Sequence, residues 1–277
     1  MCLILLLIVF WLSMVILTYI IFYYEAANGS HLELMRSKGS VSVLLLKGFL
    51  WTLYSHLVLG ALTITTMHRR FWHLPAGPAS RTPVIFVHGL YHNRTAWYLY
   101  LRWFRKWGWH HIKAVNLGGK FRSIEDFTRV LARQVDKILS ETGASRADLV
   151  GHSMGGLVIR SYMVENSART KIRRIVTLGS PHAGSKLAVL AVGKAAKEMV
   201  PGSSFIESLS RTKNQVPDGG DFYAIYSIVD NMVLPNQSAM FTAEGAKNLE
   251  TSVVNHVGLL FCKHTARLVR QCLEEGE

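Results

Sequence analysis

Short apolar runs alternate with helix-length segments along most of the chain, and this alternation restricts the fold more than any other feature. The runs that we expect to be strands are 83–88, 111–117, 147–151, 172–179, 222–229 and 252–255, and the expected helices are 94–107, 124–142, 155–166 and 259–273. Strands separated by helices form a mainly parallel sheet covered by helices on both faces. Residues 84–87 are apolar at every position, as in a strand buried on both sides. The sequence therefore predicts an α/β fold.

The N-terminal end of the chain is apolar enough to meet lipid. Residues 3–24 form an unbroken apolar run whose only polar members are Ser13 and Thr18. As a helix, a run of this length crosses about 30 Å of hydrocarbon. No charge precedes the run, and the small pair Ala26-Ala27 comes late for a cleavage site, so the pattern favours an uncleaved membrane helix over a signal peptide.

A second apolar run covers residues 41–66, interrupted by Lys47 and His56 and loosened by two glycines. We expect a second membrane span here, although a helix packed on the catalytic domain or lying in the interface has the same pattern. Residues 75–81 contain proline, glycine and serine and are typical of a linker. The expected organisation is a membrane-anchoring region at 1–74, a linker at 75–81 and an α/β domain at 82–277.

Charge and composition also favour contact with a lipid membrane. Hydrophobic residues make up 49% of the chain and charged residues 18%, against roughly 25% charged residues in ordinary soluble domains. The formal net charge is +13, and many basic residues stand close together: Arg69, Arg70, Arg94, Arg102, Arg105, Lys106, Lys113, Lys120 and Arg122. An anionic phospholipid surface would attract them, and a solvated basic face is the alternative. No nucleic-acid-binding module is evident, so we expect no nucleic acid partner.

The segment Gly151-His152-Ser153-Met154-Gly155-Gly156 interrupts an apolar strand with two polar residues surrounded by glycines. Glycines at this spacing permit a sharp turn from strand to helix that exposes the middle residue. Ser153 would then stand at the carboxyl end of a strand, where open α/β sheets bind their ligands. A simple glycine and serine turn is the alternative, so the rest of the chain has to supply partners for the serine.

A serine hydroxyl becomes a nucleophile when a base takes its proton and a third group orients that base. On such a turn the expected chain order is serine, acid, histidine. Asp230 directly ends an apolar strand, whereas Asp218 and Asp221 precede that strand in a turn. His256 follows a short strand-like segment, whereas His264 falls within the last predicted helix. We therefore expect Asp230 to be the acid and His256 the base.

The tetrahedral intermediate of acyl transfer needs backbone donors for its oxyanion. One should be the amide of Met154, which follows the serine and starts a helix. The other should come from the loop after the first strand, where Gly89 permits close approach and Leu90 supplies the amide. Residues 186–196 form an apolar segment between two core strands, which is either a lid, an acyl-binding wall or a core helix.

Three segments carry a resemblance to a known family: Phe86-Val87-His88-Gly89-Leu90, the Ser153 segment, and Leu178-Gly179-Ser180-Pro181-His182-Ala183-Gly184-Ser185. Together they resemble α/β-hydrolase lipases and esterases, in particular the bacterial triacylglycerol lipase and GPI-inositol-deacylase-like group, from about residue 82 to about residue 273. The resemblance implies an α/β-hydrolase fold with Ser153 as nucleophile, Asp230 as acid and His256 as base, and no metal or organic cofactor. The calcium-site acidic pair, the disulfide pair and the long cap of secreted lipases are not evident.

The expected function is that of a membrane-anchored esterase or lipase that cleaves carboxylic esters, of a lipid-like substrate, through an acyl-enzyme on Ser153. An acyltransferase or a thioesterase would use the same residues. A binding protein of the same fold would have lost one of the three positions, and Ser153, Asp230 and His256 are all present.

Overall fold

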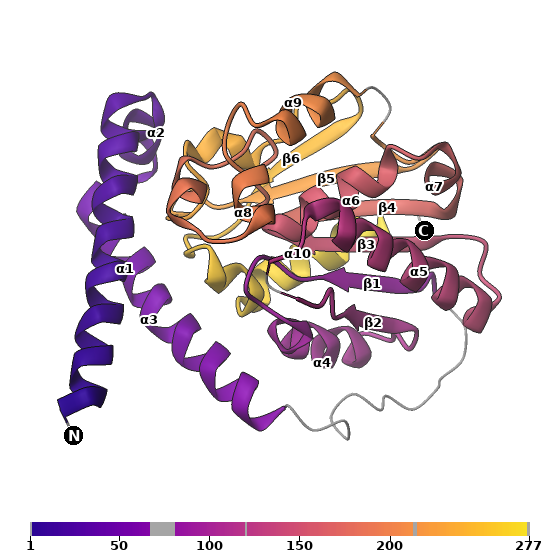
Figure 1. The fold of residues 1–277 in the computed structure, drawn as a ribbon, viewed down its shortest axis with the longest axis horizontal. Coiled ribbons are helices and arrows are strands. Elements are labelled where there is room, and N and C mark those ends of the chain that lie inside the picture. Colours follow the sequence, from indigo (N-terminus) through magenta and orange to yellow (C-terminus); the bar gives the residue numbers. More distant parts are fainter. Residues whose placement is uncertain (1, 67–80, 120, 213–214, 276–277) are drawn as a thin grey trace.

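The computed structural model of the chain describes residues 2–66, 81–119, 121–212 and 215–275. Its centre is a six-stranded sheet, in the spatial order β2-β1-β3-β4-β5-β6, in which every neighbouring pair is parallel. The strands are β1 (Val84–Val87), β2 (Ile112–Val115), β3 (Ala147–His152), β4 (Ile172–Leu178), β5 (Asp221–Tyr226) and β6 (Ala246–Glu250). The predicted fold class is confirmed: a parallel sheet with helices on both faces and two apolar helices before it (Figure 1).

Helices connect the strands and cover the sheet. They are α1 (Cys2–Asn28), α2 (His31–Lys38), α3 (Val41–Thr65), α4 (Tyr98–Lys106), α5 (Ile124–Thr142), α6 (Met154–Met163), α7 (Asn166–Lys171), α8 (Lys194–Glu198), α9 (Ser204–Arg211) and α10 (Lys263–Glu274). Single turns of 3₁₀-helix occur at η2 (Arg94–Trp97), η3 (Lys186–Leu190), η4 (Asn236–Ala239) and η5 (Val257–Leu260). Helix α5 begins and ends at the residues that the sequence predicts.

The two faces of the sheet bury alternate residues of each strand. In β1, Ile85 and Val87 belong to the core under α5 and α6, whereas Val84 and Phe86 belong to the core under α4 and α10. All four side chains are fully buried. This two-sided burial explains why the strand is apolar at every position.

The aromatic residues between positions 97 and 109 divide between core and surface. Trp97, Tyr100 and Trp109 are completely buried in the core beneath α4, against Phe86 and Phe104. Tyr98, Trp103 and Trp107 are partly exposed. Packing on the sheet therefore accounts for the buried half of the set.

The sixth strand is not where the sequence predicts it. Residues 252–255 form a loop, and the strand is Ala246–Glu250, which pairs with β5. The edge strand is polar and half-exposed, so it lacks the apolar pattern on which the prediction relied. The last helix also starts later than expected, because residues 257–260 form a separate 3₁₀ turn before Lys263.

Helices α1 and α3 form an antiparallel hairpin, joined by α2, that packs along one side of the α/β domain (Figure 1). Both predicted apolar helices are present, and residues 8–28 and 41–65 are long and apolar enough to cross a membrane. In the most apolar stretch of each helix only 11% and 22% of the residues are buried in the protein, so much of the hairpin's apolar surface is not covered by the α/β domain. Arg81 is the only residue of the predicted linker among the described residues.

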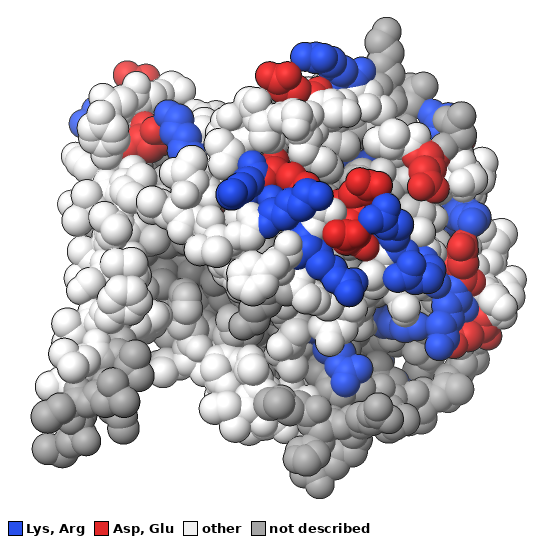
Figure 2. All heavy atoms as spheres, in the orientation of Figure 1, with Lys and Arg blue, Asp and Glu red and all other residues white. Residues whose placement is uncertain are grey.

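Charged side chains are distributed unevenly over the surface. The column formed by the hairpin is almost free of them for most of its length, whereas Lys, Arg, Asp and Glu gather over the α/β domain around α5 and α8 (Figure 2). Of the predicted basic cluster, Arg69, Arg70 and Lys120 lie outside the described residues.

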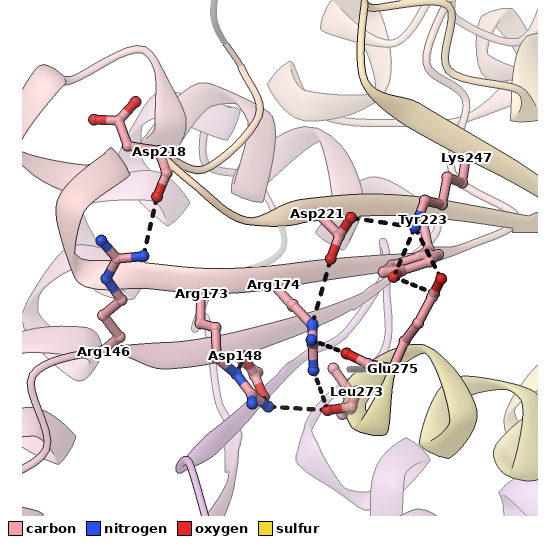
Figure 3. Close-up of polar contacts among 10 residues, drawn as sticks. All are labelled: Arg146, Asp148, Arg173, Arg174, Asp218, Asp221, Tyr223, Lys247, Leu273 and Glu275. Carbon is pink, nitrogen blue, oxygen red and sulfur yellow. Dashed lines mark hydrogen bonds and ion pairs between the residues drawn. The ribbon is translucent and has the colours of Figure 1, made fainter. Parts of the chain in front are cut away.

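The C-terminal end is attached to the edge of the sheet opposite the carboxyl ends of the strands. Arg173 donates from Nε and Nη2 to the two oxygens of the buried Asp148 carboxylate, at 3.0 and 2.7 Å. Nη2 also donates to the carbonyl of Leu273. Arg174 donates to the same carbonyl and to that of Glu275 (Figure 3). These bonds hold α10 against the sheet, far along β3 from Ser153.

Candidate active site

Ser153 stands on a sharp turn between β3 and α6. Its backbone angles are φ 54° and ψ −127°, a conformation that is strained for a residue with a side chain. The positions around it must be glycine, because a side chain there would clash with neighbouring atoms. A Cβ on Gly155 would lie 2.3 Å from the carbonyl oxygen of Val87, and one on Gly156 would lie 2.1 Å from the Ser180 hydroxyl. The turn predicted from the sequence is therefore present, with the geometry that exposes the serine.

Asp230 and His256 are brought together by two different loops. The Asp230 carboxylate follows β5, and its Oδ2 lies 2.8 Å from Nδ1 of His256. Asp230 is fully buried, and its Oδ1 accepts hydrogen bonds from the amides of Met232 and Val233 at 2.9 and 3.1 Å. Three donors thus stabilise the buried carboxylate, and they fix its direction toward the imidazole.

The contact with Asp230 orients the ring of His256. Because Nδ1 faces the carboxylate, Nε2 is the nitrogen left for a substrate or a nucleophile. His152 supports this arrangement: its Nε2 lies 3.1 Å from the carbonyl of His256, and the two ring centres are 4.6 Å apart. Burial holds the pKa of His152 well below its usual value, so this support is uncharged.

The loop after β1 approaches Ser153 from the other side. Gly89 comes so close that a Cβ on it would lie 2.9 Å from the Ser153 Cβ. His88, just before it, is buried, and burial lowers its pKa to about 4. Leu90 is the next residue, and Tyr91 has a positive φ of 60°. The loop predicted to supply an oxyanion donor therefore lies beside the serine.

A cavity of about 280 Å³ opens over these residues. Ser153, His256, Gly89 and Leu90 line it, together with apolar side chains from residues 187–199, from the loop after β5 and from the segment after His256. The apolar members include Leu187, Ala188, Ala191, Met199, Met232 and Val257. Most of the lining surface is apolar and polar side chains make up the rest, which is the usual composition of a small-molecule site.

The segment predicted as a lid or acyl wall forms the outer side of this cavity. Leu187 and Ala188 face the cavity, whereas Val189, Leu190 and Val192 are about two-thirds exposed. Tyr91 ties the segment to the loop after β1, because its hydroxyl bonds both the carbonyl and the amide of Val192 at 2.6 Å. The wall interpretation therefore fits the contacts of this segment better than a core helix does.

Of the five residues singled out in the sequence, Ser153, His256 and Leu90 line one cavity, Asp230 contacts His256, and Met154 follows Ser153 at the start of α6. Asp218 and Asp221 lie at the other end of β5, and His264 is exposed on α10. Sequence reasoning missed His56, which comes from α3 and lines the same cavity. No local pattern marks His56, because only the packing of the hairpin brings it there.

Within the part of the chain that the structure describes, no group of three or more His, Cys, Asp or Glu side chains is placed to hold a metal ion. The reactive groups gathered at the site are a serine hydroxyl, an imidazole oriented by a carboxylate, and backbone amides at a helix start.

Comparison with known proteins gives one family match and several relatives. The family of palmitoyl protein thioesterases matches residues 83–214. Triacylglycerol lipases of Pseudarthrobacter phenanthrenivorans and Burkholderia plantarii are each 32% identical over 118 residues, which is 40% of this chain. The aligned part covers 36% and 32% of those lipases, so the chain spans about a third of the curated relatives that it matches.

Solved structures share the fold over a larger part of the chain. A Bacillus licheniformis lipase in its mature form superposes with a TM-score of 0.62 at 21% identity, covering 72% of this chain and 94% of the lipase. Lipase B of Aspergillus fumigatus gives a TM-score of 0.64 at 20% identity, covering 73% of this chain and 56% of that one. At such identities the likeness concerns the fold.

Proposed function

We propose, from the premise that this chain is an α/β-hydrolase of the lipase and esterase type, that it is a membrane-anchored serine hydrolase of carboxylic esters. One observation carries the proposal. His256, whose Nδ1 lies 2.8 Å from Asp230, lines the same cavity as Ser153, which is held at a positive φ. A turn that served only to join β3 to α6 would need neither the strained serine nor an oriented histidine beside it.

In the proposed mechanism, Nε2 of His256 takes the proton of the Ser153 hydroxyl as the oxygen attacks the ester carbonyl. Asp230 holds the imidazole in the tautomer with Nδ1 protonated and stabilises the imidazolium that forms. The amides of Met154 and Leu90 donate to the oxyanion. Met154 is the first residue of α6, so its amide has no acceptor within the helix.

Collapse of the tetrahedral intermediate expels the alcohol, which receives its proton from His256. Water then attacks the acyl-enzyme, His256 takes a proton from that water, and the carboxylic acid leaves as Ser153 recovers its proton. The bonds and protons balance without a metal or an organic cofactor.

The apolar lining of the cavity supports a lipid-like acyl group as substrate. The cavity walls come from apolar side chains of residues 187–199 and of the loop after β5, and burial of an acyl chain against such walls is favourable. The apolar hairpin beside the cavity would hold the enzyme at a lipid surface, and the net positive charge would favour an anionic one.

A thioesterase is the second candidate, because the matched family is described as palmitoyl protein thioesterase. The same serine, histidine and oxyanion donors would cleave an acyl thioester, with a thiol leaving in place of an alcohol. An acyltransferase, in which an alcohol replaces water in the second step, also remains an alternative.

The test is Ser153→Ala in the full-length protein purified in detergent. Wild type should hydrolyse p-nitrophenyl acyl esters and react with a fluorophosphonate probe, whereas Ser153→Ala should do neither. Equal labelling of the two proteins would remove Ser153 from the mechanism. Comparing kcat/KM for an oxygen ester and a thioester of the same acyl chain separates the esterase from the thioesterase.

A further inference from the structure

We infer that helix α3 is part of the catalytic apparatus, because it holds in register the two loops that carry Asp230 and His256, with Gly48 and Ser55 as its positioning residues. We call residues 227–234 the acid loop and residues 251–258 the base loop. The inference rests on the proposed function, since it concerns the same acid and base. It assigns the apolar hairpin a role beyond attachment to a membrane.

Helix α3 contacts the acid loop through a close approach at Gly48. A Cβ on Gly48 would lie 3.3 Å from the Cβ of Val229 and 3.0 Å from the hydroxyl of Tyr19 on α1. Val229 is fully buried and directly precedes Asp230. Any side chain at position 48 therefore pushes against the backbone neighbour of the proposed acid.

Other parts of the hairpin hold the residues on either side of this contact. His31, at the start of α2, is buried, and its Nε2 donates to the carbonyl of Ile228 at 2.7 Å. Asn231 donates from Nδ2 to the Thr18 hydroxyl of α1 at 2.8 Å. The residues before and after Asp230 are thus fixed to the hairpin by polar contacts.

The same face of α3 contacts the base loop two turns further along. The Ser55 hydroxyl lies 3.3 Å from Oδ1 of Asn255 and 3.2 Å from the carbonyl of Thr52 in its own helix. Oδ1 of Asn255 also accepts from the amide of Gly258 at 2.9 Å, which closes the turn around His256. Ser55 and Asn255 are completely buried.

Close packing adds to this polar contact. A Cβ on Gly258 would lie 3.2 Å from Cε3 of Trp51 on α3. Gly48, Trp51 and Ser55 are spaced by three and four residues, so they share one face of the helix. One face of α3 therefore contacts both loops. His56, the next residue after Ser55, lines the cavity.

The geometry of the proposed acid and base depends on these contacts. The 2.8 Å bond between Asp230 and His256 joins two loops that lie outside the sheet. Within the α/β domain, Ser227 links the loops by donating to the carbonyl of Val254 at 2.6 Å. A misplacement of about 1 Å in such a site can cost on the order of a hundredfold in rate, so a displaced α3 should lower activity.

The test compares two substitutions in the same helix of the full-length protein, Gly48→Leu and Gly60→Leu. Both add the same apolar side chain, so membrane association should change equally little. Gly48 meets the acid loop, whereas a Cβ on Gly60 would meet nothing within 4 Å. The substrate is soluble p-nitrophenyl butyrate, which makes the assay independent of a lipid surface.

We expect Gly48→Leu to lose at least tenfold in kcat/KM and Gly60→Leu to stay within twofold of wild type. In Gly48→Leu the rising limb of the pH profile should move to lower pH, because a loosened contact with Asp230 stabilises the imidazolium of His256 less. A smaller fraction of folded protein would lower kcat/KM equally at every pH and would not shift the rising limb of the profile. Wild-type kcat/KM in Gly48→Leu, or a loss with an unmoved profile, would overturn the inference.

If Gly48→Leu does not fold, Ser55→Ala takes its place, since it removes one hydroxyl and adds no volume. It should lose several-fold in kcat/KM and move the profile in the same direction, and an unmoved profile would overturn the inference. Failure of the proposed function has a different signature, because Ser153→Ala would then keep its activity. An inactive Ser153→Ala beside a fully active Gly48→Leu refutes only the role of α3.

Discussion

The imidazole of His88 accepts a hydrogen bond at Nε2 from the amide of Leu117, at 3.1 Å, while its Nδ1 donates to the carbonyl of Gly89 at 2.9 Å. Both ring nitrogens are therefore used, and the ring must be neutral to make both bonds. This pairing joins the end of β1 to the segment after β2, directly behind the loop that approaches Ser153. The loop is thus held by an interaction that protonation would break.

The free energy of unfolding should fall as pH falls from about 6.5 toward 4. Burial lowers the pKa of His88 to about 4, and it also lowers the pKa values of His152 and His182. In this window the unfolded chain binds protons that the folded chain does not, so each such histidine removes about 1.4 kcal/mol per pH unit. Denaturant unfolding at several pH values measures the slope.

His88→Gln should make that slope shallower, whereas His264→Gln, on the exposed face of α10, should leave it unchanged. A slope that is the same in wild type and His88→Gln would contradict the assignment of a neutral, buried His88.

Asp230→Asn should lower kcat by on the order of a thousandfold with little effect on folding. The amide keeps the shape of the carboxylate, but it favours the wrong tautomer of His256 and no longer stabilises the imidazolium. Steady-state kinetics with a p-nitrophenyl ester measure the loss. Asp218→Asn is the matched control, because Asp218 is half-exposed and lies at the other end of β5. Near wild-type turnover in Asp230→Asn would exclude Asp230 as the acid.

Gly155→Ala should abolish activity and lower stability, because the new methyl group would lie 2.3 Å from the carbonyl oxygen of Val87. Either α6 or the end of β1 must move, and the backbone cannot yield as a side chain can. Gly119→Ala meets nothing nearer than the Arg122 side chain at 3.5 Å, so it should behave as wild type. Thermal unfolding and fluorophosphonate labelling report the two effects. A stable, active Gly155→Ala would show that the turn is less tightly packed than described.

Arg173→Met should lower the free energy of unfolding by about 3 kcal/mol, because it removes the hydrogen-bonded ion pair between the Arg173 guanidinium and the buried carboxylate of Asp148. The pair lies at the start of β3, whereas Ser153 follows its end, so kcat of the folded protein should not change. Arg129→Met breaks exposed pairs on α5 and should cost less than about 1 kcal/mol. Equal losses in urea unfolding would show that burial of Asp148 does not matter.

The protein should remain with membranes after washing at high salt. The exposed apolar surface of the hairpin does not depend on ionic strength, whereas attraction between the basic residues and anionic lipid is screened. Sedimentation of membranes followed by detection of the protein checks this. Release into the soluble fraction by salt alone would refute an apolar anchor.

The sequence by itself determined the class of fold, the position of most strands and helices, and the residues of the proposed site. It could do so because most of these depend on local patterns: apolar runs that are buried on both faces, glycines around a serine, and an acid in the segment that follows a strand. The contact between Asp230 and His256 follows from topology as well, since the carboxyl ends of parallel strands meet at one edge. The sequence did not predict the polar edge strand Ala246–Glu250, because it is formed by backbone pairing with β5 and has no apolar pattern.

Only the tertiary structure decided where the hairpin lies. The apolar pattern of residues 41–66 is the same for a membrane span, an interfacial helix and a helix packed on the domain. Contacts between residues about 200 positions apart, such as Ser55 with Asn255, leave no signature in either segment. They depend on how two surfaces fit, and this fit places His56 in the wall of the cavity and α3 against both loops that carry the proposed acid and base.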